Sequence, residues 1–236
     1  SPLTLSDAAI VDDGFNIAVE AKPTVHGPGP VVMSSDASIL PVISQPTVTM
    51  AIWQRQHLPP ASDLCRDLAA LPVDQKPHGR FTAPWQDCGE RLDSLYRNPA
   101  RDCGEVITRQ QLADDVTRLA TLFHKVTGAE QLETRLQVIR HDACQFWHID
   151  NVEYRLICTY HGPGTQWVEP EYGQEALDQR DRWDGPSNSL MPGDVSIFNG
   201  ARQPRAQGIV HRSPPIKAKG EVRLVLCLNV ASDQHR

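Results

Sequence analysis

The sequence predicts an α+β fold in which a helical N-terminal region precedes a C-terminal half built of short strands. Two observations indicate this order. Between residues 62 and 127, apolar residues recur at helical spacing in two segments. Beyond residue 131, short apolar runs are separated by turn residues, a pattern typical of a β-sandwich or barrel. With 236 residues, the chain is long enough to bury a sizeable core without a disulfide or metal staple.

Three regions are expected along the chain. Residues 1–46 are rich in Pro, Gly and Ser, which predicts a loosely packed arm with a short strand near 31–33. Residues 47–133 form a helical region that buttresses the strands, and it opens with a β-branched, apolar strand at 47–56. Residues 134–236 form the strand-rich core.

Two helices are expected in the middle region. The first covers SDLCRDLAAL, and Ser62 or Asp63 is its expected N-cap. The second spans 108–127, with Thr108 as its expected N-cap. Its apolar stripe consists of Leu112, Val116, Leu119, Leu122 and Phe123. A stripe on one side needs a covering sheet or helix, so this helix is expected to pack on the strands.

The C-terminal half contains seven short apolar segments separated by the turns HGPGT, MPGD and PPIKAKGE. The segments are TRLQVIR, CQFWHID, YRLICTYH, TQWVE, DVSIFNG, QGIVH and VRLVLCLNV. A polar stretch at 172–192 interrupts them and predicts an exposed insertion with a helical turn.

Composition excludes several classes of function. The formal net charge is -6 and the pI about 5.8, which argues against a dedicated nucleic-acid binder because phosphate recognition needs a basic face. No apolar run is long enough to span a membrane, and the N-terminus does not resemble a secretory signal. The six cysteines form no Cys-x-x-Cys pair, which favours buried free thiols and a cytoplasmic setting. The sequence indicates no oligomeric state.

Three residues form a candidate metal site. His148 and Asp150 lie two positions apart at the end of a predicted strand, so their side chains share one face. This pair alone also fits a surface strand end whose Asp caps a turn. His211 ends another predicted strand, and distant strands become neighbours in a barrel. Two imidazoles and one carboxylate form a facial triad, which binds Fe(II) and leaves positions open for substrate and dioxygen. The same donor set also binds zinc.

Arg223 is a candidate anion-binding residue. In the last predicted strand it shares a face with Val225 and Cys227. An arginine on an inward, apolar face is costly unless it meets an anion, and a carboxylate satisfies it through two hydrogen bonds. The strand is apolar on both faces, however, so an outward and solvated Arg223 fits the pattern equally well.

The order of these motifs resembles the 2-oxoglutarate and Fe(II)-dependent oxygenases. The order is His-x-Asp, then Gly193-Asp194 before an aromatic strand, then His-x-x-Pro, then Arg before the final strand. The resemblance covers about residues 134–230 and implies a double-stranded β-helix, also called a jelly-roll or cupin-like barrel. It implies the triad as the iron ligands and Arg223 as the clamp for the distal carboxylate of the cosubstrate, 2-oxoglutarate.

The spacing departs from the family pattern at one point. Eleven residues, 212–222, separate His211 from Arg223, one more than is usual in the family. A shift of one residue turns a strand side chain to the opposite face. Arg155 is therefore a second candidate for the carboxylate clamp, or else a salt-bridge partner that orients Asp150. Tyr160 is a candidate for a hydrogen bond to the cosubstrate, or else a core residue with its hydroxyl at the edge.

The whole chain also resembles an uncharacterised bacterial family catalogued as a domain of unknown function. The resembling segments are AIWQR, WHIDNVEYRLICTYHGPGTQWVE and HRSPP. That family is associated with zinc-responsive gene neighbourhoods. The first hypothesis is thus a 2-oxoglutarate-dependent dioxygenase, a hydroxylase acting on a small molecule or peptide. The second is a cupin-like metal-binding protein, connected with zinc, that lacks oxygenase activity. The third is a structural or interaction protein whose His and Asp residues are incidental.

Overall fold

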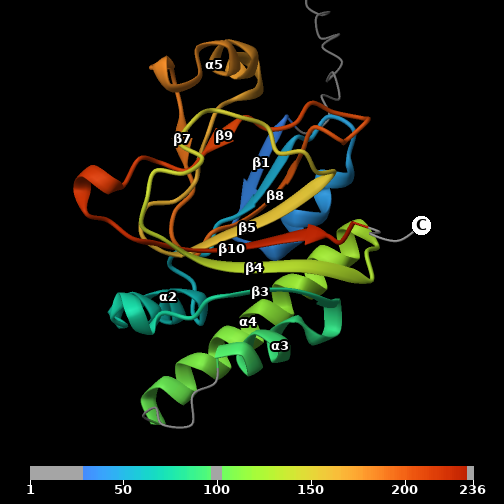
Figure 1. Cartoon of the computed structure of the whole chain (residues 1–236). Coiled ribbons are helices and arrows are strands. Elements are labelled where there is room, and N and C mark those ends of the chain that lie inside the picture. The colour runs from blue at the N-terminus through green and yellow to red at the C-terminus, as the bar shows by residue number, and fades with distance from the viewer. Residues whose placement is uncertain (1–28, 97–102, 233–236) are drawn as a thin grey trace, which may run out of the picture.

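The computed structural model describes residues 29–96 and 103–232, and a seven-stranded sheet forms its centre (Figure 1). The strand order is β1-β2-β8-β5-β10-β4-β3. Only the β1–β2 pair is parallel, and the other pairs are antiparallel. A second sheet has the order β7-β6-β9. The strands are β1 (Val31–Ser34), β2 (Met50–Trp53), β3 (Gly79–Pro84), β4 (Gln131–Ile139), β5 (Tyr154–His161), β6 (Gln166–Trp167), β7 (Asn188–Ser189), β8 (Val195–Asn199), β9 (His211–Arg212) and β10 (Arg223–Val230).

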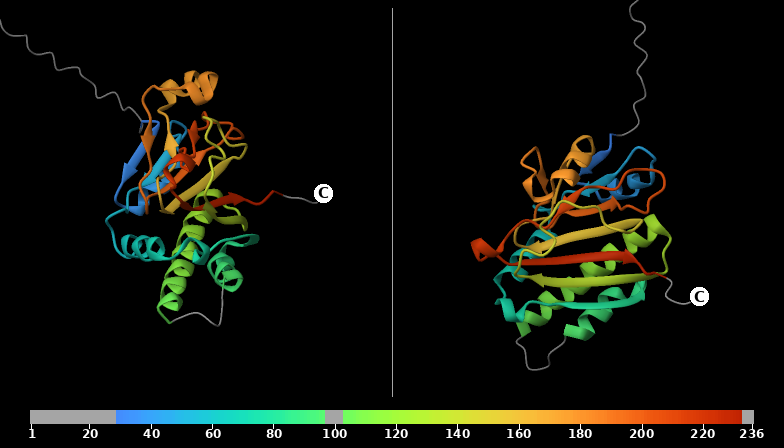
Figure 2. Two further views of the ribbon diagram at one scale, coloured as in Figure 1. Left: turned by 60° about the vertical axis from the view of Figure 1, so that its left-hand side comes forward. Right: turned by 45° about the horizontal axis from the view of Figure 1, so that its top comes forward.

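Helices α2, α3 and α4 cover one face of the large sheet (Figure 2). The predicted apolar stripe of the long helix is buried there, with Leu112, Val116, Leu119 and Phe123 each at most 2% exposed. The α-helices are α2 (Ala61–Ala70), α3 (Cys88–Tyr96), α4 (Cys103–Thr127) and α5 (Gly173–Gln179). The 3-10 helices are η2 (Ala37–Ser44), η3 (Val73–Gln75), η4 (Trp85–Asp87), η5 (Pro170–Tyr172), η6 (Arg180–Arg182) and η7 (Lys217–Lys219).

The small sheet packs over the opposite face of the large sheet. Trp167 of β6 and the nearby Ile209 join one apolar cluster with Phe198 of β8 and Val225 of β10. Because side chains alternate along a strand, β10 sends Leu224, Leu226 and Leu228 toward the helices and Arg223, Val225 and Cys227 toward the small sheet. The chain is therefore a mixed α/β structure with two facing sheets, and the sheets are not joined into a closed barrel.

The structure differs from expectation at several element boundaries. The short strand expected near 31–33 is present as β1, but residues 37–44, expected in a loose arm, form η2, in which Leu40 and Ile43 are buried. Residues 1–28 lie outside the described part. Helix α4 begins at Cys103 instead of capping at Thr108. Helix α2 begins at Ala61, after a Pro60 that makes no side-chain cap, so neither expected cap is correct.

Two further features concern the strand-rich half. The segment CQFWHID forms no strand and contributes only an isolated bridge. The polar stretch at 172–192 contains α5 and η6, which confirms the expected helical turn. Within residues 29–96 and 103–232, no helix is both long and apolar enough to cross a bilayer.

Candidate metal centre

The backbones of the two candidate histidine ligands are hydrogen-bonded to each other. His148 N–H donates to the His211 carbonyl and His211 N–H donates to the His148 carbonyl, both at 3.0 Å. This antiparallel bridge replaces the predicted strand before His148. It brings together two residues that are 63 positions apart and leaves their imidazole ring centroids 4.6 Å apart.

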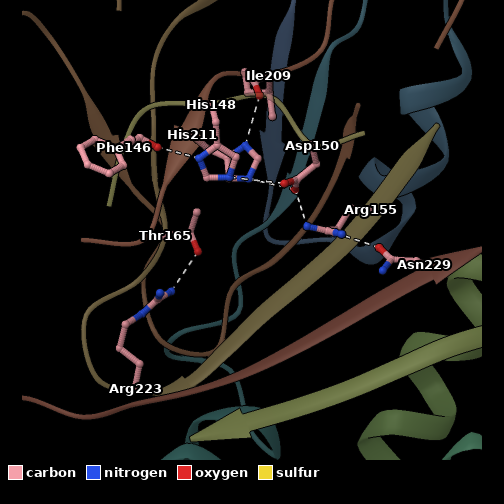
Figure 3. A network of polar contacts seen from close by, with 9 residues as sticks. All are labelled: Phe146, His148, Asp150, Arg155, Thr165, Ile209, His211, Arg223 and Asn229. Atoms are coloured by element: carbon pink, nitrogen blue, oxygen red, sulfur yellow. Dashed lines mark hydrogen bonds and ion pairs between the residues drawn. The ribbon is translucent and has the colours of Figure 1, made fainter. Parts of the chain in front are cut away.

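The three predicted ligands converge on one point (Figure 3). The Nε2 atom of His148 lies 3.4 Å from Asp150 Oδ1, and Nε2 of His211 lies 3.0 Å from Asp150 Oδ2. One donor atom from each residue falls within 4.8 Å of the others. Among the described residues, this is the one group of three or more His, Cys, Asp or Glu side chains with such spacing.

The second nitrogen of each imidazole is already engaged. Nδ1 of His148 lies 2.6 Å from the Phe146 carbonyl, and Nδ1 of His211 lies 3.1 Å from the Ile209 carbonyl. A carbonyl only accepts hydrogen bonds, so each Nδ1 carries a proton and donates it. In the neutral imidazoles both Nε2 atoms then present lone pairs to the Asp150 carboxylate.

Three hydrogen-bond acceptor groups, the two imidazole Nε2 atoms and the carboxylate, repel one another unless a cation lies between them. A proton bound to one of the imidazoles can serve as this cation. Consistent with this, hydrogen bonding to Asp150 raises the pKa of His148 above its ordinary value. Burial raises the pKa of Asp150, but hydrogen bonds from His148 and His211 outweigh it and hold that pKa well below its usual range. A divalent metal fits the same place, because backbone acceptors commonly orient metal-bound imidazoles in this way.

Arg155 lies beside the triad and orients its carboxylate. Its Nη1 donates to Asp150 Oδ2 at 2.5 Å, and its Nε donates to Asn229 Oδ1 at 2.8 Å (Figure 3). These contacts match the salt-bridge alternative raised from the sequence. Because Arg155 is already paired with Asp150, it is not a free cation for a cosubstrate carboxylate.

Arg223 points inward and is 2% exposed, in spite of the extra residue before it. Its Nη1 donates to the Ser213 hydroxyl, its Nη2 donates to Thr165 at 2.9 Å, and Thr159 lies 3.5 Å from Nη2. Its Nε donates to the Pro163 carbonyl at 2.7 Å. None of the ion pairs found in the described residues includes this guanidinium, and burial lowers its pKa to about 10.

One cavity contains both the triad and Arg223. It has a volume of about 290 Å³ and is also lined by Ser213, Thr165 and Arg155. The side chains of Figure 3 show the histidines and the Arg223 guanidinium around the same space. The cavity therefore presents a metal-binding donor set and a buried, unpaired cation to one ligand.

Tyr160 lies elsewhere, and its expected contact with a cosubstrate in this cavity is wrong. It projects from the helix-facing side of β5, is 1% exposed, and donates its hydroxyl proton to Asp115 Oδ2 at 2.6 Å. Asp115 also binds Arg55 through two hydrogen bonds of 2.6 and 2.7 Å. This buried trio holds α4 against the sheet.

Sequence reasoning considered Ser213, which follows the distal histidine, but missed Thr159, Thr165 and a further arginine, Arg135. Thr159 and Thr165 are of a residue type common in turns and strands, so no motif singles them out. Arg135 lies in β4 and lines the same cavity. The segment TRLQVIR was predicted to be a strand, but nothing in it indicated that Arg135 would line a cavity.

Residues 34–229 match the model of one protein family, described as "Protein of unknown function (DUF1826)". No curated protein sequence matches the chain. Among solved structures, a Pseudomonas putida prolyl-4-hydroxylase is 16% identical, with 83% of this chain and 99% of that chain covered and a TM-score of 0.40. The Arabidopsis thaliana dioxygenase for auxin oxidation 1, in its 2-oxoglutarate complex, is 9% identical, with 88% and 94% covered and a TM-score of 0.47.

Proposed function

The chain belongs to the DUF1826 family, whose description assigns no activity, and from the geometry of its site we propose that it is an Fe(II) and 2-oxoglutarate-dependent dioxygenase, a hydroxylase. In this proposal His148, Asp150 and His211 hold the iron. The two facing sheets are a double-stranded β-helix whose large sheet is extended by β1 and β2 at one edge and by β3 at the other.

The environment of Arg223 carries the proposal. A buried guanidinium surrounded by hydroxyl and carbonyl groups retains its full charge, and a buried charge is costly without a counter-ion. A carboxylate entering the cavity supplies that counter-ion and accepts two parallel hydrogen bonds. The hydroxyls of Ser213 and Thr165 add further donors once they turn toward the ligand.

2-Oxoglutarate has the two ends that this cavity requires. Its keto-acid end suits a metal with open positions, and its distal carboxylate suits Arg223. When bound, iron and 2-oxoglutarate supply the oxidising chemistry, in which dioxygen, 2-oxoglutarate and R–H become R–OH, succinate and carbon dioxide. The chain orients the two histidines through carbonyl acceptors, orients Asp150 through Arg155, and excludes water with the apolar residues beneath the site.

The second candidate is a metal-binding protein that lacks oxygenase activity. The donor set favours it, because two imidazoles and a carboxylate bind zinc as readily as iron and divalent affinities do not favour iron. This candidate leaves the buried, unpaired Arg223 without a role, so we rank it below the dioxygenase.

The test uses the full chain, purified without chelator and loaded anaerobically with Fe(II). Titration with 2-oxoglutarate should produce the weak visible charge-transfer band of the iron–2-oxoglutarate chelate and saturate near one equivalent. His211→Ala should abolish both the band and iron binding. His57→Ala, which removes an exposed histidine far from the triad in sequence, should leave both unchanged. Tightly held zinc, with no band after exchange to iron, would instead support the metal-binding protein.

A further inference from the structure

Two arginines face each other on the cavity side of the large sheet. Arg80 of β3 and Arg135 of β4 are direct cross-strand partners, and Arg135 is in turn opposite Cys227 of β10. Direct partners in an antiparallel pair project to the same face, and Cys227 lines the metal cavity. Like charges directly opposite each other destabilise a sheet unless an anion lies between them.

Asp74, an exposed carboxylate, lines the adjoining cavity, and the two acidic groups nearer to Arg135 are bound to other residues. Glu133 forms an ion pair with Arg80 at 3.2 Å, and Asp150 is bound by Arg155 and the two histidines. The Nε atom of Arg135 is buried and has no hydrogen-bond partner. Unsatisfied buried donors are rare in folded proteins and need an explanation. The guanidinium of Arg135 is hydrogen-bonded to the Cys227 thiol, but among the described residues no acidic group forms an ion pair with it.

Arg135 lies where two cavities meet. It lines the metal cavity and also an adjoining cavity of about 490 Å³, and Gln137 and Val138 are likewise shared by the two. Arg80 and Arg140 line the adjoining cavity as well. The volume of this second cavity falls within the usual range of small-molecule sites. A ligand there would lie beside the metal cavity without displacing whatever Arg223 binds.

The charges of the metal cavity favour an anionic ligand. Its lining contains three arginines, at positions 135, 155 and 223, against one carboxylate, Asp150. A divalent metal and the dianion 2-oxoglutarate cancel each other's charge. The occupied cavity would thus keep an excess of two positive charges, three from arginine minus one from Asp150. Such a field attracts anions and raises their rate of association.

We propose that the primary substrate is a small anion whose carboxylate or phosphate group binds Arg135 at the junction of the two cavities. This inference rests on the proposed function and extends it to the class of substrate. Arg135 then places the anionic end of the substrate, and the remainder of the molecule extends toward the metal. Arg80 and Arg140 draw the anion into the adjoining cavity.

The test uses the full chain loaded with Mn(II), a paramagnetic substitute for iron, and saturated with 2-oxoglutarate so that Arg223 is occupied. The probes are acetate, inorganic phosphate and the neutral analogue acetamide, each observed by its nuclear magnetic relaxation. We expect at least one of the two anions to be relaxed at least fivefold more than acetamide. Whichever anion gives the larger effect identifies the carboxylate or the phosphate source.

Variants link this effect to one side chain. Arg135→Gln should reduce the anion effect at least fivefold, and Arg135→Lys should restore part of it. Arg118→Gln removes the same charge from an exposed position on α4, on the other side of the sheet, and should change nothing. The binding of 2-oxoglutarate should stay within twofold in all three variants.

The outcomes separate this inference from the function on which it rests. Failure of the wild-type protein to bind Mn(II) and 2-oxoglutarate would overturn the proposed function and this inference together. Normal 2-oxoglutarate binding, with anions relaxed no more than acetamide, would overturn the inference alone. So would an anion effect that persists in Arg135→Gln, because the anion would then be bound by the metal or by another residue.

Discussion

The two faces of the large sheet each bury an arginine, but the two arginines have different partners. On the helix face, Arg55 is 1% exposed and forms a bidentate ion pair with Asp115, which also accepts the Tyr160 hydroxyl. On the cavity face, Arg223 is 2% exposed and meets hydroxyl and carbonyl oxygens. The two arginines are buried to a similar extent, and they differ in that the chain supplies a counter-ion to Arg55 and none to Arg223.

The pKa values follow this difference. Burial acts to lower the pKa of both guanidinium groups. For Arg55 the hydrogen bonds and charge of Asp115 outweigh burial, and its pKa rises above the ordinary value. For Arg223 burial dominates, and its pKa falls to about 10. A buried cation that the chain neutralises supports the fold, whereas a buried cation that the chain leaves unpaired is a place for a ligand.

Removing the counter-ion on the helix face should have the largest effect on stability. Asp115→Ala leaves the Arg55 charge buried and unpaired, which costs about 3–5 kcal/mol of unfolding free energy. Asp114→Ala, at the exposed neighbouring position, is the matched control and should cost less than about 0.5 kcal/mol. Denaturant titration of both variants measures the difference. Equal losses would show that Arg55 does not depend on Asp115.

Removing Arg223, the unpaired arginine on the cavity face, should reduce ligand affinity and leave stability nearly unchanged. Arg223→Met replaces a buried, unneutralised charge by an apolar side chain of similar length, so the unfolding free energy should stay within about 1 kcal/mol of wild type or rise. Affinity for 2-oxoglutarate should fall at least about 100-fold, which corresponds to about 2.7 kcal/mol. The charge-transfer band reports the affinity. A large loss of stability with unchanged affinity would make Arg223 a structural residue like Arg55.

Alkaline pH should weaken the helix face specifically. Burial raises the pKa of Cys65 to about 11 and of Cys158 to about 12, from 9.0 in the unfolded chain, and raises that of Tyr160 above 10.0. The native state therefore retains protons that the unfolded state loses, so stability is full below pH 9 and falls above it. Each thiol contributes a loss of about 1.4 kcal/mol per pH unit between its two pKa values.

Denaturant titrations at pH 8, 9, 10 and 11 measure this slope. Cys65→Ala should reduce the slope by about the contribution of one thiol, because Cys158, Cys88 and Tyr160, whose pKa values are also raised, remain. A stability that does not change between pH 9 and 11 would contradict the raised pKa values of both thiols.

The sequence predicted the candidate ligands better than their surroundings. His148, Asp150 and His211 converge as expected, although a bridge takes the place of the predicted strand. The face of Arg223 could not be predicted, because β10 is buried on both sides and its alternation carries no signal. The longer connection before it is taken up by η7 and by Gly220, whose φ of +63° is left-handed.

Tyr160 was misplaced for a related reason. Strand β5 is buried on both faces for most of its length, so its pattern does not reveal which side chains face the helices. Tyr160 lies five positions after Arg155, so alternation along β5 puts the two side chains on opposite faces, as the structure shows and the prediction did not take into account. The Arg55–Asp115 pair joins positions sixty residues apart, and no local pattern indicates such a pairing.

The paired backbone hydrogen bonds between His148 and His211 have a consequence for how the chain can vary. They fix the positions of the two imidazoles relative to each other. The chain segment that connects the two histidines is long and contains β5 to β8 and α5. Lengthening this segment costs little additional entropy, because the entropic cost of bringing its ends together grows only with the logarithm of its length. The α5 insertion can therefore lengthen or shorten, and so alter what surrounds the metal centre, while the two ligands keep their mutual geometry.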